Sequence, residues 1–314
     1  MKLLLLGGTV FLGRAAAEEA LARDHQVTLF TRGRSNPGLF PEAEHLVGDR
    51  SGDLDALAGR QWDAVLDLSG YVPAHVRASA ELLRDSGHYT FVSSVSVYAD
   101  LAQGRAEEAA VAELGGAATD RLEDDYSNYG ALKALCEEEA RRVFGERTLV
   151  VRPGLIVGPH DPTGRFTYWA RRLARGGRLL APGPPDRRVQ FVDVRDLAEW
   201  LVSSVERRLA GVFNAVHEGV PFGELLDGAD VTWVPDDFLL EHGVRPWVEL
   251  PLWLPEGPYA GMNATDVSRA VAAGLRFRPA TESLAGAADA REVEGTGLTP
   301  EREAELLAAW DDRR

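Results

Sequence analysis

The sequence has little of several features that define large classes of protein. It contains a single cysteine, Cys136, so no disulfide can form within the chain, as is typical of proteins in a reducing compartment. The apolar stretch at the N-terminus, Met1 to Leu6, breaks at Gly7-Gly8 and is too short for a signal-peptide core or a membrane span. No later stretch approaches the ~18 apolar residues of a membrane helix. We therefore expect a cytoplasmic protein without membrane contact.

Basic residues are scarce relative to acidic ones. The chain has 34 Lys and Arg residues against 49 Asp and Glu, which gives a formal net charge of −15. Because an acidic surface repels polyanions, we expect no nucleic-acid partner. The seven histidines show no metal-ligand spacing and no cysteine cluster accompanies them, so no metal is expected. A small molecule remains as the expected partner.

What is present predicts an α/β protein. With 314 residues, 45% of them hydrophobic, the chain is long enough for one large domain with an appended lobe. Apolar runs alternate with helical periods in the first half. The expected strands are 2–6, 26–31, 45–48, 64–68, 88–93 and 148–151, and the expected helices are 11–24, 74–85 and 128–144. This alternation predicts a Rossmann-type, doubly wound parallel sheet with crossover helices.

A glycine-rich segment joins the first expected strand to the first expected helix. It reads Gly7-Gly8-Thr9-Val10-Phe11-Leu12-Gly13. Small residues permit a tight turn, and Gly13 lets the helix approach the strand closely. The N-terminus of that helix can hold a pyrophosphate with its free N–H groups and its dipole. We therefore expect Gly7, Gly8, Thr9, Phe11, Leu12 and Gly13 to bind a dinucleotide cofactor.

The ends of the next strands indicate which dinucleotide binds. The second strand ends in Thr31-Arg32-Gly33-Arg34, with no acid to bind the ribose hydroxyls of NAD, so Arg32 or Arg34 could pair with a 2′-phosphate. We therefore expect NADP(H) to be preferred, with NAD(H) as an alternative and solvated loop arginines as the other interpretation. Asp49 could accept a hydrogen bond from the adenine or cap a turn. Leu68-Ser69-Gly70 would pass close to the cofactor because Gly70 has no side chain.

A second set of residues could carry chemistry. Tyr129 and Lys133 lie four residues apart, on one face of the expected helix 128–144. A nearby ammonium lowers the pKa of a phenol, which would make Tyr129 usable as an acid/base. The strand 88–93 ends in Ser93-Ser94-Val95-Ser96 and places hydroxyl groups at the carboxyl edge of the sheet, where such folds bind their ligands.

With these motifs in order, the first 215 residues or so resemble the extended short-chain dehydrogenase/reductases, the NAD(P)-dependent epimerase/dehydratase family. The resemblance implies that Ser94 polarises the substrate oxygen, that Tyr129 is the acid/base, and that Lys133 binds the nicotinamide ribose and tunes Tyr129. Ser93, Pro153 and Gly154 would lie near the cofactor, and Ser96 and His160 near the substrate. Members of the family are often homodimers, although no interface stripe stands out here.

The sequence departs from the family pattern at identifiable positions. Val10 occupies the place of the middle glycine in the loop, and Val95-Ser96 replaces the Asp-Glu pair of the family's dehydratases. The leading hypothesis is thus hydride transfer between NADP(H) and a carbonyl or alcohol carbon of a small substrate. One alternative is a nucleotide-sugar epimerase that retains its cofactor. The segments Gly-Gly-Thr-x-Phe-Leu-Gly and Thr-Arg-Gly-Arg also resemble chloroplast stem-loop-binding proteins and bacterial reductases, so an RNA-binding or regulatory protein is another.

After Arg152-Pro153 the texture becomes irregular. A strand at 189–192 is expected to return to the sheet, and helices are expected at 166–175, 194–207, 264–273 and 300–310. We therefore expect a dinucleotide-binding domain of residues 1–153 plus about 187–215, and a substrate-binding lobe of about 154–186 plus 216–314. The arginines of helix 166–175 and its start could face an anionic substrate, but a solvated face is the favoured interpretation. Glu137-Glu138-Glu139 is expected to be a solvated helix face as well.

Overall fold

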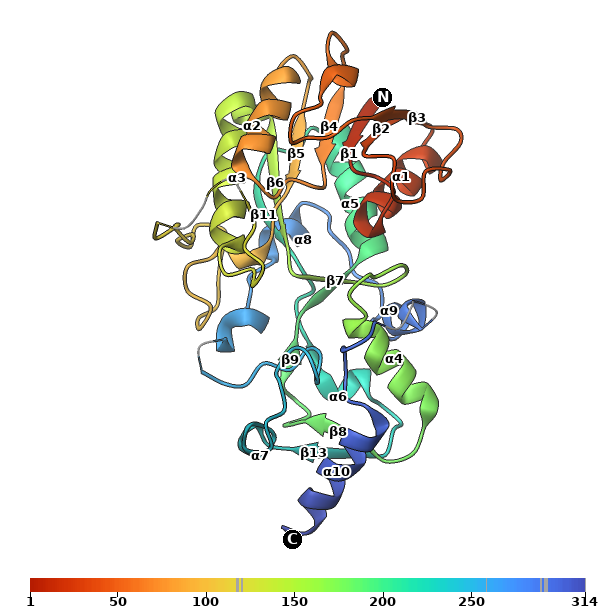
Figure 1. Ribbon diagram of the computed structural model, residues 1–314, viewed down its shortest axis with the longest axis vertical. Helices are drawn as coiled ribbons and strands as arrows, with labels where there is room; N and C mark the ends of the chain where they lie inside the picture. Colours follow the sequence, from red (N-terminus) through yellow and green to blue (C-terminus); the bar gives the residue numbers. More distant parts are fainter. Residues whose placement is uncertain (117–118, 120, 258, 289, 291–292, 314) are drawn as a thin grey trace.

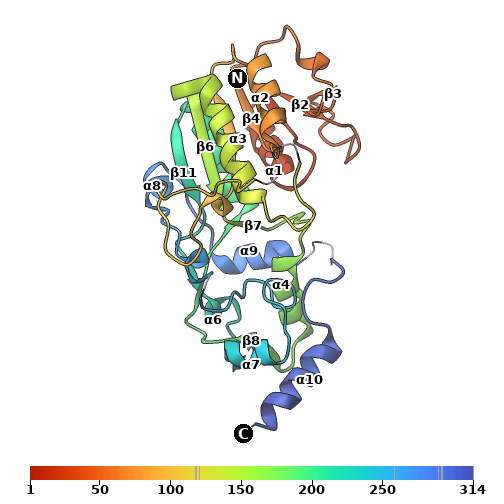
Figure 2. The ribbon, with the colours of Figure 1, turned by 60° about the vertical axis from the view of Figure 1, so that its left-hand side comes forward.

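The computed structural model describes residues 1–116, 119, 121–257, 259–288, 290 and 293–313. The molecule is elongated, with a large sheet and the N-terminus towards one end and the C-terminus at the other (Figure 1). We call the end that contains the large sheet and the N-terminus the sheet half, and the end that contains the C-terminus the lower lobe. The same division is visible after rotation of the view (Figure 2).

Among the described residues, the central sheet has seven parallel strands in the order β11-β6-β5-β4-β1-β2-β3. Their bounds are β1 (Lys2–Leu6), β2 (Gln26–Thr31), β3 (Glu44–Val47), β4 (Ala64–Asp67), β5 (Tyr89–Val92), β6 (Thr148–Pro153) and β11 (Gly211–Ala215). The expected Rossmann-type sheet is confirmed, and its inner strands are almost entirely buried.

Helices cover both faces of this sheet. Helices α1 (Phe11–Ala22) and α5 (Val194–Glu206) pack together on one face, and α2 (Pro73–Leu82) and α3 (Tyr129–Phe144) pack together on the other (Figure 1). Ala16, Ala17 and Ala20 of α1 are fully buried, because their small side chains let the helix approach closely. Apolar cores lie on both sides of the sheet, as a doubly wound fold requires.

The position of β1 determines where a ligand can bind. Its neighbours are β2 on one side and β4 on the other, so the chain winds in opposite directions from this strand. Such a switch point opens a crevice beyond the carboxyl ends of the strands. The glycine-rich segment after β1 and the segments after β4 and β5 all meet at this edge.

The strand that returns to the sheet is not the expected one. Residues 191–193 form β10 (Phe191–Asp193), which pairs with β7 (Leu155–Val157) outside the main sheet. The sheet is instead extended by β11, which pairs with β6 from Gly211↔Leu149 to Ala215↔Pro153. The expected single strand at 189–192 is divided at Gln190 between β9 (Arg188–Val189) and β10, because apolar periodicity indicates burial but not the strand partners.

The lower lobe has its own apolar core. Its remaining elements are α4 (Arg165–Arg175), β8 (Leu179–Pro182), β9 (Arg188–Val189), β12 (Val220–Pro221), α6 (Phe222–Leu225), β13 (Val231–Val234), α7 (Asp236–Glu241), α8 (Ser268–Ala272), α9 (Ala280–Ala287) and α10 (Pro300–Asp311). Short 3₁₀ turns occur in both halves of the molecule. They are η1 (Asp55–Leu57), η2 (Val95–Val97), η3 (Gly145–Arg147) and η4 (Ala260–Asn263). Trp169, Phe222 and Trp253 are fully buried in this core. Helix α8 is the exception to the spatial division, because it packs against β11. The division into two domains proposed from the sequence stays a prediction.

Candidate functional site

The glycine-rich loop has the backbone that only glycine accommodates easily. Gly7 and Gly8 have φ values of 115° and 119°, a region that favours glycine. A Cβ added to Gly13 would lie 2.6 Å from the nitrogen of Gly8, so the first turn of α1 rests directly on the loop. Val10 has an extended backbone with φ −136°, which any residue adopts. Its departure from the family glycine therefore introduces no strain.

The other loop residues contribute in different ways. The Thr9 carbonyl accepts a hydrogen bond of 2.8 Å from Asn36 Nδ2, which ties the loop to the segment after β2. Leu12 is buried in the apolar core beneath the sheet, so its side chain packs and only its backbone faces the start of the helix. Phe11 begins α1 with a φ of 41°, a left-handed backbone that costs energy in a non-glycine residue.

The end of β2 leaves two cations exposed. Arg32 and Arg34 are exposed, and both lie close enough to lower the pKa of Asp49, although hydrogen bonds from Ser51 are the largest cause. Thr31 Oγ1 accepts from the Gly33 amide at 3.2 Å. Asp49 Oδ1 accepts from the Ser51 amide at 3.0 Å and from its hydroxyl at 2.8 Å. Its turn-capping role is therefore present, and the proposed adenine contact stays a prediction.

The segment after β4 is held by its neighbours. Ser69 Oγ donates to the Leu6 carbonyl at 2.9 Å, which joins the ends of β4 and β1. A Cβ on Gly70 would lie 2.6 Å from Phe91 and 2.8 Å from Val76. The absent side chain of Gly70 thus makes room for apolar neighbours within the protein, a reason that the sequence argument did not include.

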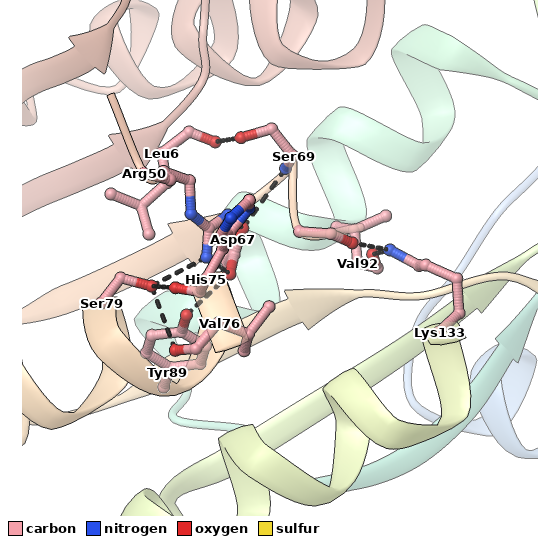
Figure 3. A network of polar contacts seen from close by, with 11 residues as sticks. Leu6, Arg50, Asp67, Ser69, His75, Val76, Ser79, Tyr89, Val92 and Lys133 are labelled. Carbon is pink, nitrogen blue, oxygen red and sulfur yellow. Dashed lines mark hydrogen bonds and ion pairs between the residues drawn. The ribbon is translucent and has the colours of Figure 1, made fainter. Parts of the chain in front are cut away.

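Lys133 is the buried cation of the site. Its side chain points from α3 towards the strand ends, and its Nζ donates to the carbonyls of Gly70 and Val92, both at 2.7 Å (Figure 3). Because the amine is removed from water, burial lowers the pKa of Lys133 to about 8. An ammonium has three donors, and the structure uses two of them among the described residues. The third suits a ribose hydroxyl.

Ser94 and Tyr129 come together, although they are 35 positions apart in the chain. The Ser94 hydroxyl lies close enough to the Tyr129 phenol to lower its pKa. It also accepts from the Ser96 amide at 3.1 Å, capping η2, and donates to Ser96 Oγ at 3.1 Å. A Cβ on Gly130 would lie 2.1 Å from the Ser96 carbonyl oxygen, so only glycine lets α3 approach η2 this closely. The two hydroxyls can therefore bind one oxygen atom of a ligand.

The expected effect of Lys133 on Tyr129 is not what the structure shows. Burial raises the pKa of Tyr129 to about 12, and the nearby Ser94 hydroxyl offsets only part of this rise. The reason lies in the geometry, because the ammonium of Lys133 faces two carbonyl oxygens. In this state the phenol is a proton donor, which is the form needed to protonate an oxyanion.

The remaining predicted residues fall into two groups. Pro153 ends β6 and is buried, and Gly154 follows with Val216 2.6 Å from where its Cβ would be. Ser93 is buried beside them, and its Oγ has no hydrogen-bond partner among the described residues. His160 is exposed with a φ of 66°. Its neighbour Asp161 accepts from the Thr163 amide at 2.8 Å and holds the turn.

A buried polar network was missed by the sequence analysis. Arg50 donates from Nη2 to Asp67 Oδ2 at 2.7 Å and to Ser79 Oγ at 2.8 Å, and the Tyr89 hydroxyl donates to Asp67 Oδ2 at 2.7 Å (Figure 3). Asp67 is fully buried and also accepts from the Ser69 amide. The network therefore fixes the loop after β4, in which the Gly70 carbonyl accepts a hydrogen bond from Lys133. The sequence feature that could have revealed this network is Asp67, an acidic residue at the end of a strand that is otherwise apolar.

Two further expectations are wrong. Glu137 is buried, and both its oxygens accept from Arg152 at 2.9 and 2.7 Å, so it anchors α3 to β6 instead of facing solvent. Arg172 of α4 is also buried and pairs with Glu303 at 2.7 Å, so this arginine is not on a solvated face. A charged side chain at these positions is stable because a partner from another element satisfies it.

A small cavity borders the site on the side of the lower lobe. Its lining includes Val95, Gly154, Gln190, Trp247 and Met262, so it lies between the η2 turn and the lower lobe. Among the described residues, no group of His, Cys, Asp and Glu side chains could hold a metal ion. None of the described helices is both apolar enough and long enough to cross a bilayer.

Comparison with known proteins identifies the family. A sequence model of the NAD dependent epimerase/dehydratase family matches residues 3–215. The chain is 28% identical, over 68% of its length and 58% of the relative, to the chloroplast stem-loop binding protein of 41 kDa b from Arabidopsis thaliana. It is 29% identical to the 2-alkyl-3-oxoalkanoate reductase of Stenotrophomonas maltophilia, over 64% of each chain. The chain thus matches less than two thirds of the length of these relatives.

Solved structures agree on the fold. The crystal structure of a human epimerase family protein with NADPH superposes with a TM-score of 0.59 at 20% identity, covering 92% of this chain and 99% of the human one. The family match spans the glycine-rich loop, η2, α3 and the returning strand β11. The chain belongs to the NAD dependent epimerase/dehydratase family of the extended short-chain dehydrogenase/reductases, a family of NAD(P)-dependent enzymes.

Proposed function

We propose that this chain is an NADP(H)-dependent oxidoreductase that interconverts a carbonyl and an alcohol on a small molecule. The observation that carries the proposal is the nearness of the Ser94 hydroxyl to the Tyr129 phenol at the carboxyl edge of the sheet, where Gly130 lets α3 approach η2, with Lys133 buried one helical turn from Tyr129. Two hydroxyl groups there can hold one substrate oxygen, one of them as a proton donor. The reductase relative supports the same chemistry.

The residues around the site fit a dinucleotide. Gly7 and Gly8 provide the tight loop, and the start of α1 supplies free N–H groups to a pyrophosphate. Arg32 and Arg34 stand exposed just after β2, and two cations facing a single nearby carboxylate, Asp49, favour a 2′-phosphate. Ser93 Oγ and the third donor of Lys133 are available to the nicotinamide end. When bound, the nicotinamide supplies or accepts the hydride.

The protein groups then have defined tasks. Ser94 and Tyr129 donate hydrogen bonds to the carbonyl oxygen and so polarise it, and Tyr129 gives its proton to that oxygen as the alcohol forms. Lys133 holds the nicotinamide ribose with its third donor, and the phenolate that remains takes a proton back from solvent. In the reverse direction the same groups remove the proton of the alcohol. The site needs no metal for these steps.

The test is turnover of candidate carbonyl compounds, followed as loss of NADPH absorbance at 340 nm. Tyr129→Phe removes the proton donor and should lower kcat by about 10²- to 10⁴-fold, while NADPH binding measured by fluorescence stays within about twofold. Tyr259→Phe is the matched control, because Tyr259 is an exposed phenol outside the site, and it should behave as wild type. Undiminished turnover in Tyr129→Phe would remove Tyr129 from the mechanism. A cofactor retained through purification, with no net loss of NADPH, would favour the epimerase.

A further inference from the structure

Arg165 is a cation at the junction of the sheet half and the lower lobe, with Asp161 as a nearby opposite charge. It is the first residue of α4, which begins just beyond β7 and runs away from the sheet (Figures 1 and 2). Its side chain is half-buried, and its guanidinium lies 5.4 Å from the centre of the Trp247 ring. Among the described residues, the guanidinium makes no hydrogen bond or ion pair. Nearby Asp161 directs its carboxylate to Thr163 instead.

The other arginines of α4 differ from Arg165 in this respect. Arg172 and Arg175 pair with Glu303 at 2.7 and 2.8 Å, and Arg171 donates to the Ala290 carbonyl at 2.9 Å. Burial lowers the pKa of Arg165, and the nearby Asp161 offsets only part of this shift, so the charge of the guanidinium is incompletely compensated. An anion that binds beside such a cation forms a strong, charge-assisted hydrogen bond with it.

Aromatic side chains connect Arg165 to the chemical centre. Tyr126 is close enough to affect the pKa of Arg165, and its ring lies 6.4 Å from that of Tyr129, edge on. Trp247, on which the guanidinium rests, lines the small cavity together with Val95, the residue after Ser94. Trp247 therefore connects the cation to a cavity whose wall includes the neighbour of Ser94.

The backbone around this space is strained. Tyr126, Trp247 and His160 have φ values of 59°, 63° and 66°, in the left-handed region that bulky residues avoid. A backbone of this kind is strained, and such strain is common where a protein holds a ligand. Of these residues, Tyr126 lies against Tyr129 and Trp247 lies against Arg165.

We propose that Arg165 binds an anionic group of the substrate, a carboxylate or a phosphate, while Ser94 and Tyr129 hold its carbonyl oxygen. The inference rests on the proposed function and names its substrate class: carbonyl compounds that carry an oxyanion beyond an apolar, aromatic-lined segment. The planar fork of the guanidinium matches two oxygens of either group. The stacking on Trp247 fixes the direction of that fork.

Three matched aldehydes test this assignment. They are 4-formylbenzoate, its neutral methyl ester, and 4-formylphenyl phosphate, each followed with NADPH at 340 nm. Wild type should reduce at least one of the anionic aldehydes with a kcat/KM about tenfold or more above that of the ester, because a hydrogen bond to a charged group is worth this much. The two anions separate carboxylate from phosphate recognition. In Arg165→Gln the preference for the anion should fall to about one, mainly through KM.

Two further variants sharpen the result. Arg165→Lys keeps the charge but loses the fork, so it should retain only part of the preference. Arg175→Gln removes a positive charge from the same helix and should keep the full preference. Equal kcat/KM for ester and anions in wild type would overturn the assignment, as would an unchanged preference in Arg165→Gln.

A binding measurement separates this inference from the proposed function. 4-Formylbenzoate and 4-formylphenyl phosphate are titrated calorimetrically into protein saturated with NADP⁺, where no reduction can occur. Tighter binding of either anion than of the ester by wild type, lost about tenfold in Arg165→Gln, supports the anion site even if no aldehyde is turned over. Equal binding by the two proteins overturns it, whatever the turnover shows.

Discussion

The sheet half and the lower lobe are held together by different kinds of contact. In the sheet half, several groups of the candidate site follow the ends of neighbouring parallel strands, as Ser69 does after β4 and Ser94 after β5, while Tyr129 and Lys133 come from the one helix α3. In the lower lobe, decisive partners are far apart in sequence. Arg172 meets Glu303 across 131 residues, and Trp169 Nε1 donates to the Pro251 carbonyl across 82. Local sequence patterns therefore indicate where several groups of the candidate site lie. The shape of the lower lobe depends instead on pairings between residues far apart in the sequence.

The largest expected effect tests the lower lobe. Glu303 is buried and accepts from Arg172, Arg175 and the Leu180 amide, so Glu303→Ala leaves Arg172 buried without its carboxylate. We expect a loss of about 3–5 kcal/mol in the free energy of unfolding, measured by urea denaturation. Glu305→Ala is the control, because Glu305 pairs with Arg302 at the surface and should cost less than about 1 kcal/mol. Similar losses in the two variants would mean that the buried pair does not hold the lobe.

The second prediction concerns the cofactor end of the sheet half. In the double variant Arg32→Ser, Arg34→Ser, NADPH should bind about 10- to 100-fold more weakly, because a charge-assisted contact to the 2′-phosphate contributes about 1.5–3 kcal/mol. NADH binding should change little. Both dissociation constants can be measured by fluorescence, with Arg84→Ser as the control for an exposed arginine. An equal loss for both cofactors would show that the arginines do not select the phosphate.

The smallest expected effect probes Lys133. Its folded pKa of about 8 lies below the usual value of about 10.4, so the unfolded chain keeps a proton that the folded chain loses. Raising the pH from 7 to 9 should therefore stabilise the folded protein through this residue, by about 1 kcal/mol. The measurement is the difference in unfolding free energy between wild type and Lys133→Met across that range, without cofactor. A difference that does not change with pH would mean that Lys133 is not titrating there.

Much of the sheet half could be predicted from the sequence. The strand at 26–31 and the helix that carries Tyr129 lie where the periodicity places them, within a residue or so at each end, because each buries a continuous apolar face. The place of Ser94 at the carboxyl edge also follows, since it comes directly after β5, whereas Tyr129 is brought to it by the packing of α3 on η2 at Gly130. The direction of the Tyr129 pKa shift did not follow, because it depends on where the Lys133 amine finds its acceptors.

The failures share a physical cause. Arg50, Glu137 and Arg172 are charged residues removed largely from water. This is tolerated only because each pairs with a residue of opposite charge on another element. Composition and periodicity assign such residues to the surface. The run at 189–192 is a related case, since its apolar pattern indicates burial but not the strand partners. Which partner is present depends on tertiary packing, which one sequence does not display.

The path of the chain between the two halves has a mechanical consequence. It leaves the sheet after β6, comes back through α5 and β11, leaves again, and returns once more to set α8 against β11. A lobe attached by one linker could rotate freely relative to the sheet. Several chain crossings between the two halves restrict the lobe to small rotations. Substrate entry is therefore expected to depend on movements of side chains such as Tyr126 and Trp247 at the junction, with little displacement of the lobe as a body.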